Sequence, residues 1–426
     1  MMKKVPKRRF KGFLNAGDWE QRKLGELGKT FNGLTGKTKK DFGHGDAQYI
    51  TYLNVFQNTI SDLSMTERIE IDKSQNTVQY GDILFTTSSE TPEEVGMSSV
   101  WLGEKPNTYL NSFCFGYRPT VDIDHQFMGN LLRSPHVRNE MKILAQGITR
   151  YNISKNKVMD LEITLPSKEE QKLIGSILNH IDSQLTLHQR KLEKLQATKK
   201  ALLYELFPIE NSRRPKRRFK GFTDDWEQRK LGEVFGCLQN NTLSRDELNY
   251  KVPNVKNIHY GDILIKFDEV VDWNSADIPF INNNLDLSKY SNSLLRDGDI
   301  VFADTAEDDT VGKAIELQNV KTPYALAGLH TIPCRSLIPF GKGYMGNFLN
   351  SESYRCQLRP LMQGIKVSSI SKQALKNTTI KYPLDLLEQS QIGNIFFHIT
   401  TLLTLHQRKL EKLKNLKAAY LNEMFV

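Results

Sequence analysis

The sequence predicts an α+β protein in which two globular α/β domains are joined by two long helices that pair as an antiparallel coiled coil. Three observations lead to this prediction. The chain repeats its own landmarks once, with a period of a little over 200 residues. The variable segments between the landmarks combine strand and helix patterns, and each is followed by an apolar heptad pattern. The fold is therefore expected to be an internal pseudo-twofold repeat.

The repeat rests on three blocks that recur unchanged and in the same order. Their lengths are seven, eight and nine residues, too long to match by chance: Lys7–Phe13 as Lys216–Phe222, Trp19–Glu26 as Trp226–Glu233, and Leu187–Leu195 as Leu405–Leu413. The segments between them share only short signposts, such as Gln146-Gly147-Ile148 and Gln363-Gly364-Ile365. This pattern predicts a first globular domain, a helical spacer, a second globular domain and a second spacer, at residues 1–165, 166–208, 209–383 and 384–426.

The variable segments have mixed α and β character. Alternation, β-branched residues and Gly-Asp turns predict strands at Tyr49–Val55, Asp82–Thr86, Gly261–Ile265 and Asp299–Ala303. Helical patterns cover Phe127–Ala145 and Gly346–Met362. Each variable segment is therefore expected to fold as a small α+β domain.

Each spacer begins with a capping-box pattern. Ser167 with Glu170 opens the first, and Asp385 with Glu388 opens the second. Pro208 is expected to stop the first helix near Phe207, giving roughly 40 residues and about 60 Å. The predicted seam positions are mostly apolar: Ile174, Leu178, Ile181, Leu185, His188, Leu192 and Leu195, then Ile392, Phe396, Ile399, Leu403, His406, Leu410 and Leu413.

The intervening domain allows the chain to return, so the two helices are expected to run antiparallel. His188 and His406 are polar seam residues at equivalent places near the helix midpoints, and Lys199 and Lys417 are polar seam residues further along. Antiparallel pairing brings the histidines together and separates the lysines, which avoids burying like charges at one level. A packed polar layer explains two histidines without acidic or cysteine neighbours better than a metal site does, so no metal is predicted.

Composition restricts the class of protein. The chain of 426 residues carries 58 Lys and Arg against 49 Asp and Glu, a formal charge of +9, which permits a polyanionic partner. No apolar run approaches the length of a membrane span, so no membrane partner is expected. Four widely spaced cysteines without a CxxC pair argue against a disulfide framework and favour a cytoplasmic location.

Catalytic motifs are missing from the sequence. It contains no P-loop, no GxSxG and no HExxH pattern. Asp160 and Glu170-Gln171-Lys172 loosely match a nuclease pattern, but the capping box explains Glu170, and the second repeat has lost the lysine. No catalytic residue is therefore predicted.

Two basic runs precede the variable segments. Lys3–Lys11 has six basic residues in nine, and Arg213–Lys220 has six in eight. A solvated linker is one interpretation. Contact with phosphates or with an acidic partner surface is the other, and the position before each domain leaves both open.

Three loops in each variable segment carry residue types that contact phosphates and base edges. A plain surface loop explains any one of them alone, but matching places with different residues suggest two readers of different sequences. The candidate DNA-binding residues are Lys37, Thr38, Lys39, Lys40, Thr87, Ser88, Ser89, Arg150, Tyr151 and Asn152 in the first segment, and Asn240, Asn241, Thr305, Lys366 and Ser368 in the second.

The whole arrangement resembles the specificity subunit of Type I restriction–modification enzymes. The resemblance rests on a variable domain opened by Trp19–Glu26, a Gly-Asp-Ile strand and a Pro…Glu-Gln…Ile-Gly entry into a long helix, all of it repeated. It implies two target-recognition domains, each gripping one half of an asymmetric split site in double-stranded DNA. It also implies a non-catalytic chain whose helices dock two methyltransferase subunits. Restriction (motor) subunits are implied as further partners, with S-adenosylmethionine, ATP and Mg held by partner subunits.

Two other functions remain open from the residues alone. One is a coiled-coil scaffold with two protein-binding modules. The other is the recognition module of a Type II-like methyltransferase-nuclease. Salt-dependent binding to methylatable DNA separates the scaffold from both DNA-reading functions.

Overall fold

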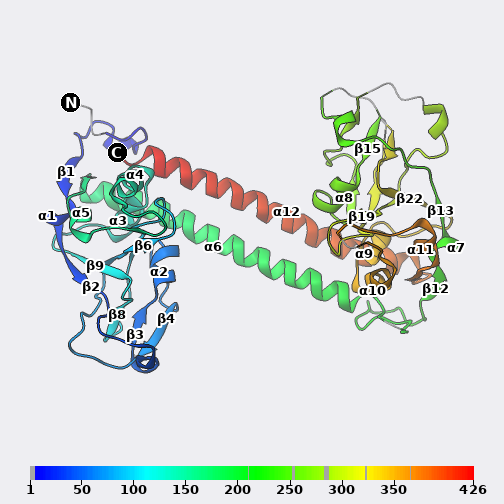
Figure 1. The fold of residues 1–426 in the computed structure, drawn as a ribbon. Coiled ribbons are helices and arrows are strands. Elements are labelled where there is room, and N and C mark those ends of the chain that lie inside the picture. Colours follow the sequence, from blue (N-terminus) through cyan, green and yellow to red (C-terminus); the bar gives the residue numbers. More distant parts are fainter. Residues whose placement is uncertain (1–4, 210, 252–254, 283–286, 322–323, 365) are drawn as a thin grey trace. The chain divides into compact units, whose positions relative to one another are not determined.

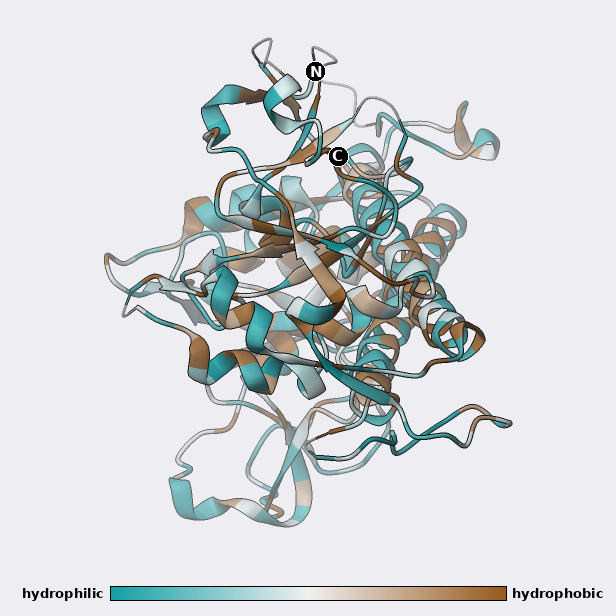
Figure 2. Cartoon of the chain, turned by 90° about the vertical axis from the view of Figure 1, so that its right-hand side faces the viewer, coloured by the Kyte–Doolittle hydropathy of each residue, from teal (hydrophilic) through white to brown (hydrophobic). Residues whose placement is uncertain are grey.

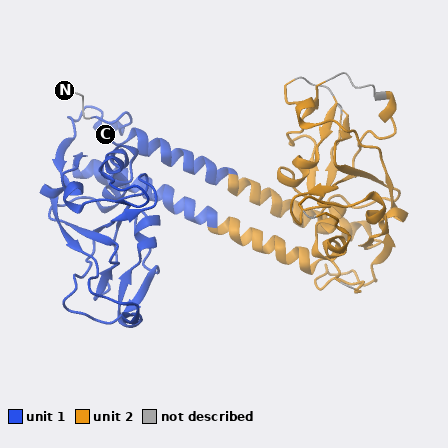
Figure 3. Ribbon diagram, viewed as in Figure 1, with its two compact units in different colours: residues 1–189, 408–426 blue, residues 190–407 orange. Residues whose placement is uncertain are grey.

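The computed structural model describes residues 5–209, 211–251, 255–282, 287–321, 324–364 and 366–426 (Figure 1). The chain forms two compact units (Figure 3). Unit 1 contains residues 1–189 and 408–426, and unit 2 contains residues 190–407. Each unit therefore combines one globular domain with parts of both long helices, so the compact units divide the chain differently from the predicted domains and spacers.

Unit 1 is built around a four-stranded sheet of order β2-β9-β5-β7 and a three-stranded sheet of order β4-β3-β8. Its strands are β1 Glu20–Lys23, β2 Gly28–Asn32, β3 Phe42–Ile50, β4 Thr66–Ile69, β5 Ile83–Thr86, β6 Ser88–Ser89, β7 Ser98–Val100, β8 Thr108–Leu110, β9 Cys114–Pro119, β10 Tyr151–Asn152 and β11 Glu162–Leu165. Its helices are η1 Lys11–Phe13, α1 Leu24–Leu27, η2 Lys39–Asp41, α2 Tyr52–Gln57, α3 His125–Leu132, α4 Pro135–Leu144, α5 Lys155–Met159 and the first part of α6 Lys168–Glu205.

Unit 2 has a five-stranded sheet of order β13-β22-β18-β20-β16 and a four-stranded sheet of order β14-β17-β15-β21. Its strands are β12 Glu227–Lys230, β13 Phe235–Cys237, β14 Leu248–Asn249, β15 Lys256–Ile258, β16 Val270–Asp272, β17 Phe280–Ile281, β18 Ile300–Ala303, β19 Thr305–Ala306, β20 Ala314–Gln318, β21 Ala325–Ala327, β22 Thr331–Ser336, β23 Ser368–Ser369 and β24 Thr379–Tyr382. Its helices are α7 Leu231–Val234, η3 Arg245–Glu247, α8 Tyr260–Ile265, η4 Leu287–Tyr290, α9 Tyr344–Leu349, α10 Glu352–Leu358, η5 Arg359–Leu361, α11 Lys372–Asn377 and most of α12 Leu386–Glu423.

The two globular domains close in the same way. In unit 1, β1 pairs antiparallel with β11, so that Glu20 lies opposite Leu165. In unit 2, β12 pairs antiparallel with β24, and Glu227 lies opposite Tyr382. Each ladder joins the two ends of a variable segment directly before a long helix. The repeated sequence thus builds the same closing ladder in both domains, in agreement with the predicted repeat.

Both cores include the beginning of one long helix and the end of the other. In unit 1, Ile174 and Leu178 of α6 share a buried cluster with Phe425, whose ring centroid lies 5.5 Å from that of Phe127. In unit 2, Phe396 of α12 stacks on Phe207, which follows α6, at 5.9 Å. Within each unit the α6 and α12 segments therefore run antiparallel, which confirms the predicted pairing direction.

The polar seam lysines each have an acidic partner within their own unit. Lys417 lies 2.6 Å from Asp182 in unit 1, and Lys199 lies 2.6 Å from Glu269 in unit 2. These ion pairs explain how a lysine is accommodated at a largely apolar seam. His188 belongs to unit 1 and His406 to unit 2, so their predicted meeting stays a prediction.

The basic runs have a structural role that neither sequence interpretation anticipated. Arg9 makes a bidentate pair with Glu170, with nitrogen–oxygen distances of 2.7 and 2.8 Å. Arg218 makes the equivalent bidentate pair with Glu388, with the same two distances. Lys3 and Lys4 lie outside the described residues. These arginines fasten the segment before each domain to the first turn of the helix that follows that domain.

A second pair of contacts fastens the same segments to the ends of the helices. The Arg8 amide donates to the Glu423 carbonyl at 2.9 Å, and its guanidinium lies 2.6 Å from the Glu423 carboxylate. The Arg217 amide and guanidinium contact Glu205 at the same two distances. The two basic runs therefore make equivalent intramolecular staples.

The predicted capping boxes form only in part. The Glu170 amide donates to Ser167 Oγ at 3.4 Å, and the Leu387 amide donates to Asp385 Oδ1 at 2.7 Å. The carboxylates of Glu170 and Glu388 instead bind the arginines of the staples. The ion pair, and not the box, explains why Glu170 is buried.

Several predicted elements differ from the structure. Gly261–Ile265, predicted as a strand, lies within helix α8, where His259 Nδ1 accepts from the Gly261 amide and caps the helix. The Tyr49–Val55 strand is wrong in its second half, because α2 begins at Tyr52 with Thr51 as its cap. Phe127–Ala145 is split between α3 and α4. Gly346–Met362 is likewise broken, into α9, α10 and η5.

Apolar residues follow this architecture. Figure 2 shows them concentrated on the inner strands of the sheets and on the helix faces, with hydrophilic residues on most loops. Among the described residues, none of the helices is both long enough and apolar enough to cross a membrane.

Candidate nucleic-acid interface

In unit 1 the candidate site is a short ladder where the main sheet ends. Strand β6, which follows β5 after one residue, pairs with β10, so Tyr151 lies opposite Ser89 and Asn152 opposite Ser88. The Ile153 amide donates to the Thr87 carbonyl at 2.9 Å. The structure therefore brings together two loops, at 87–89 and 150–152, that are more than 60 residues apart in the sequence.

Unit 2 contains the same arrangement of a two-stranded ladder and a backbone hydrogen bond beside it, hereafter the frame. Strand β19 pairs with β23, so that Thr305 lies opposite Ser369. The Ile370 amide donates to the Asp304 carbonyl at 2.8 Å, the counterpart of the Ile153–Thr87 bond. The offset of 217 residues between Thr87 and Asp304 also relates Ile153 to Ile370. Backbone geometry is thus repeated where the side chains differ.

A glycine shapes the hairpin in each copy. Gly147 has φ 144° and Gly364 has φ 122°, both unfavourable for residues with a side chain. A Cβ at Gly147 would collide with the Arg150 carbonyl oxygen, and one at Gly364 with the Val367 carbonyl oxygen. This requirement explains why the Gln-Gly signpost survives in two otherwise divergent segments. The third signpost residue of the second copy, Ile365, lies outside the described residues.

Two aromatic residues that the sequence did not single out complete the frames. In unit 1, Phe113 accepts hydrogen bonds through its carbonyl from the Thr87 amide at 3.0 Å and from Thr87 Oγ1 at 2.8 Å. Phe113 is 56% exposed, and the Arg150 guanidinium lies over its ring, 5.9 Å from the ring centroid. An exposed ring under an arginine is a surface on which a base can stack.

His330 occupies the equivalent place in unit 2. Its carbonyl accepts from the Asp304 amide at 3.0 Å, and its Nδ1 lies 3.3 Å from both Asp304 Oδ1 and Thr305 Oγ1. Phe113 and His330 are again 217 residues apart. The only sequence signal for either residue is this spacing, which becomes visible once the Gln-Gly signposts are aligned.

The candidate DNA-binding residues differ in exposure. Lys39, Lys40, Arg150, Asn152 and Lys366 are exposed. Partly exposed residues are Thr87, Tyr151, Asn240, Thr305 and Ser368. Ser88 and Ser89 are buried, at 4% and 7% exposure, although their backbone forms the ladder.

Asn241 does not lie at the surface. Its side chain is 2% exposed, and its Oδ1 accepts from the Leu243 amide at 3.2 Å. The backbone amide of Asn241 donates to the Ala327 carbonyl at 2.8 Å, and the backbone amide of Leu34 makes the equivalent bond to the Leu110 carbonyl in unit 1. Asn241 thus occupies the core position of Leu34 in the repeated frame, and its side chain is not presented to a ligand.

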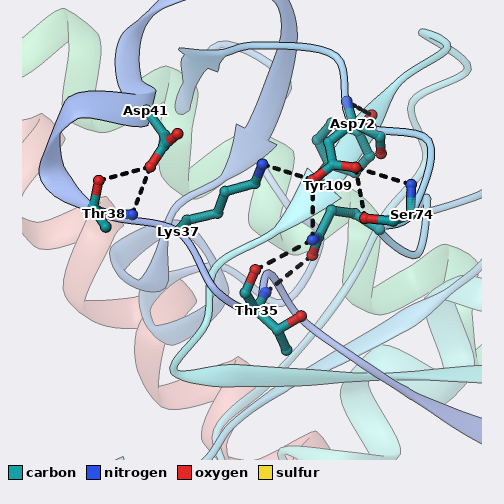
Figure 4. A network of polar contacts seen from close by, with 8 residues as sticks. Thr35, Lys37, Thr38, Asp41, Asp72, Ser74 and Tyr109 are labelled. Carbon is teal, nitrogen blue, oxygen red and sulfur yellow. Dashed lines mark hydrogen bonds and ion pairs between the residues drawn. The ribbon is translucent and has the colours of Figure 1, made fainter.

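The Lys37–Lys40 loop is held by a network of polar contacts (Figure 4). Lys37 Nζ lies 2.6 Å from Asp72 Oδ2, and both side chains are largely buried. The hydrogen bond from Lys37 holds the pKa of Asp72 well below its usual range. Thr38 donates through its amide and hydroxyl to Asp41 at 2.7 and 2.8 Å. Lys39 and Lys40 are therefore the free cations of a fixed loop, while Lys37 anchors it.

A pocket of about 270 Å³ lies between the frame and the segment that precedes this loop. Thr35, two residues before Lys37, lines it together with Thr87 and Ile153. Lys155 also lines it and donates to Asn32 Oδ1 at 2.8 Å. Segments from three parts of the sequence therefore meet at one surface of unit 1.

Comparisons with known proteins point to one family. The model of the Type I restriction modification DNA specificity domain matches residues 16–197. The Type I restriction enzyme MjaVIII specificity subunit of Methanocaldococcus jannaschii is 24% identical over 418 residues, 95% of this chain and 91% of that protein. The chain is similar to a Type I restriction–modification specificity subunit over nearly its whole length, and its first half carries the specificity domain of that family. Specificity subunits are the non-catalytic, DNA-recognising components of these systems.

Two further members of this group are similar. The putative MjaX specificity subunit of the same organism is 29% identical over 227 residues, so the match spans about half of each chain, 50% of this one and 52% of that one. The crystal structure of a Type I S subunit from M. genitalium has a TM-score of 0.60 at 16% identity and covers 99% of both chains. That likeness supports the fold.

Proposed function

We propose that this chain is a Type I specificity subunit that recognises an asymmetric, bipartite DNA target, with one half-site bound by each globular domain. The observation that carries the proposal is the repeated frame with unlike side chains. Thr87, Phe113 and Arg150 in unit 1 correspond to Asp304, His330 and Val367 in unit 2. Side chains at groove edges select bases, so different residues on one backbone frame select different half-sites.

Exposed cations supply affinity for DNA that does not depend on the base sequence. Lys39, Lys40 and Arg150 lie on the unit 1 loops, and Lys366 lies on the unit 2 hairpin. Contacts between such cations and phosphates release counterions, so binding weakens as salt rises. The formal charge of +9 agrees with a polyanionic partner.

The helices are proposed to dock two methyltransferase subunits at equivalent places. Leu187 of α6 and Leu405 of α12 open the identical nine-residue block and are 43% and 54% exposed. Equivalent exposed apolar residues on two helices suit two copies of one partner. Restriction subunits are proposed as further partners, with S-adenosylmethionine, ATP and Mg held by the partner subunits.

Methylome sequencing of a host with and without the gene tests the proposal. We expect one two-part methylation motif, with unlike halves and a fixed gap, to disappear when the gene is removed. A scaffold without DNA-reading function would leave every motif in place. A motif that is lost but palindromic would contradict the proposal of two different half-site readers.

Exchanging residues 20–160 for the equivalent segment of a relative should change only one half of the target. The exchanged segment contains the whole unit 1 frame but neither long helix. The motif of the exchange variant, measured by methylome sequencing, should keep its second half and its gap. A change in both halves would show that the domains do not read independently.

Replacing Arg150 by alanine should weaken binding to the complete target in the assembled methyltransferase. We expect the slope of log affinity against log salt to fall by about one, since one phosphate-contacting cation is removed. If the arginine also contacts a base, discrimination in the first half-site falls by about 1–3 kcal/mol. Lys157, an exposed cation on α5, provides a comparison variant within the same unit. Equal salt slopes for the Arg150 variant and the unaltered protein would show that Arg150 does not contact a DNA phosphate.

A further inference from the structure

Two of the four cysteines, distant in the sequence, face each other across a pair of strands in unit 2. Cys237 lies at the end of β13, and Cys334 lies in β22 at the directly opposite register position. They are 97 residues apart in the sequence, which shows no CxxC pair. Both thiols are free in the structure. No sequence pattern pairs them, because the register of β13 with β22 is a tertiary feature.

The register makes Cys237 and Cys334 a close pair. The neighbouring residues Leu238 and Pro333 share a ladder bond, in which the Leu238 amide donates to the Pro333 carbonyl at 2.9 Å. Hydrogen-bonded and non-hydrogen-bonded pairs alternate along an antiparallel ladder, so Cys237 and Cys334 form a non-hydrogen-bonded pair. Their Cα atoms are then expected about 4.5 Å apart, inside the roughly 4.4–6.8 Å range that a disulfide spans.

The environments of the two thiols differ in a way that suits stepwise oxidation. Cys334 is 1% exposed, whereas Cys237 is partly exposed. The Cys334 thiol, as a hydrogen-bond partner, lowers the pKa of Cys237, and the positive charges of Lys376 and Lys372 act in the same direction. The same contact and burial raise the pKa of Cys334. Cys237 is therefore the accessible thiolate, and Cys334 is the partner that resolves its oxidised form.

We propose that Cys237 and Cys334 are a redox-responsive thiol pair that closes to an intramolecular disulfide when the protein meets hydrogen peroxide. The Cys237 thiolate attacks one peroxide oxygen, the O–O bond breaks, and Cys237 becomes a sulfenic acid as hydroxide leaves. The Cys334 thiol then attacks the Cys237 sulfur, forming the S–S bond and releasing water. Two thiols lose two electrons in all, and one hydrogen peroxide is reduced to two waters, because the hydroxide takes up the proton that the Cys237 thiol released when it ionised.

The disulfide lies directly before a loop of the globular domain. Residues 238–241 follow β13 and include Asn240, whose side chain donates to the Gly328 carbonyl at 3.2 Å. The link ties β13, which lies at the edge of the five-stranded sheet, to the neighbouring strand β22. Oxidation thus fixes the strand that leads into this loop, and a dithiol reductant restores the open pair.

The test oxidises the full-length protein with hydrogen peroxide at slight molar excess. Remaining thiols are alkylated under denaturing conditions and the products are mapped by peptide mass spectrometry. We expect the number of free thiols to fall from four to two. A peptide linking Cys237 to Cys334 should appear with the loss of two hydrogens, and dithiothreitol should reverse both changes. Cys356→Ser, which removes the exposed cysteine, should leave the link intact.

Cys237→Ser and Cys334→Ser should each abolish the link, and the mapping of the unaltered protein decides the question even if the buried Cys334 variant folds poorly. The proposal is overturned if Cys237 proceeds to sulfinic acid while Cys334 stays free. It is equally overturned if all four thiols survive, or if Cys356 joins two chains in place of the internal link. None of these readouts depends on DNA binding.

Discussion

Replacing Glu170 by alanine should destabilise unit 1 by about 3 kcal/mol, because it leaves the Arg9 guanidinium buried without its counter-ion. The side chains of Arg9 and Glu170 are only 5% and 1% exposed. Arg9 Nη1 keeps its bond to the Ala16 carbonyl at 2.8 Å, which holds the cation in place after its partner is removed. For a unit of this size the melting transition of unit 1 should fall by roughly 6–12 °C.

The control for this variant is Glu169→Ala, one residue earlier on the same turn of α6. Glu169 is exposed, and its removal should change the melting temperature little. Glu388→Ala removes the equivalent carboxylate in unit 2, where Arg218 is 15% exposed, so the effect there should be smaller. Calorimetry that records both transitions separates the two units. Equal melting curves for Glu170→Ala and Glu169→Ala would mean that the staple contributes nothing to stability.

A double replacement distinguishes the ion pair from simple packing. Arg9→Met combined with Glu170→Leu removes both charges and keeps apolar volume, so most of the stability lost in Glu170→Ala should return. If the double variant is as unstable as Glu170→Ala, the loss comes from disturbed packing at the start of α6 and not from an unpaired charge.

These staples mark the limit of what the sequence could predict. Arg9 and Glu170 are 161 residues apart, and Arg218 and Glu388 are 170 apart. A basic run looks the same whether its partner is a phosphate or a distant carboxylate of the same chain. The repeat contained a signal for the ion pairs, since each basic run is followed at a similar distance by a helix with glutamate in its first turn.

The long helices were the most predictable part of the fold. Their apolar heptads and their start signals are local, and α6 and α12 each extend for 38 residues within the predicted spacers. Short elements were less predictable, because their state depends on partners elsewhere. Gly261–Ile265 has the apolar run of a strand, but capping by His259 and burial of Ile263 make it a helix.

The candidate site was predictable as loops but not as individual contacts. Matching positions of the two repeats identified the hairpins at 146–152 and 363–369, which the structure places in equivalent ladders. Asn241 failed as a surface residue because the frame gives it the buried place of Leu34. Phe113 and His330 went unnoticed because no motif marks a residue whose role arises from its neighbours in space.

Inserting one extra Leu-Glu-Lys-Leu after Leu195 and another after Leu413 should lengthen the gap between the half-sites without changing either half. The two helices contain the same tetrapeptide, at 192–195 and 410–413, so the paired insertion lengthens both partners equally. Four residues add about 6 Å of helix. With about 3.4 Å of DNA per base pair, the gap should grow by about one to two base pairs.

A four-residue insertion suits this test because coiled coils accommodate it by local unwinding of the supercoil. Methylome sequencing of the double-insertion variant gives both the half-sites and the gap. An insertion after Leu195 alone serves as the comparison, since it lengthens only one of the two helices and should impair activity at every gap length. A double insertion that methylates the original motif with its original gap would show that the spacing is fixed by partner subunits and not by the helices. Half-sites that change together with the gap would show that the helices also orient the reading loops.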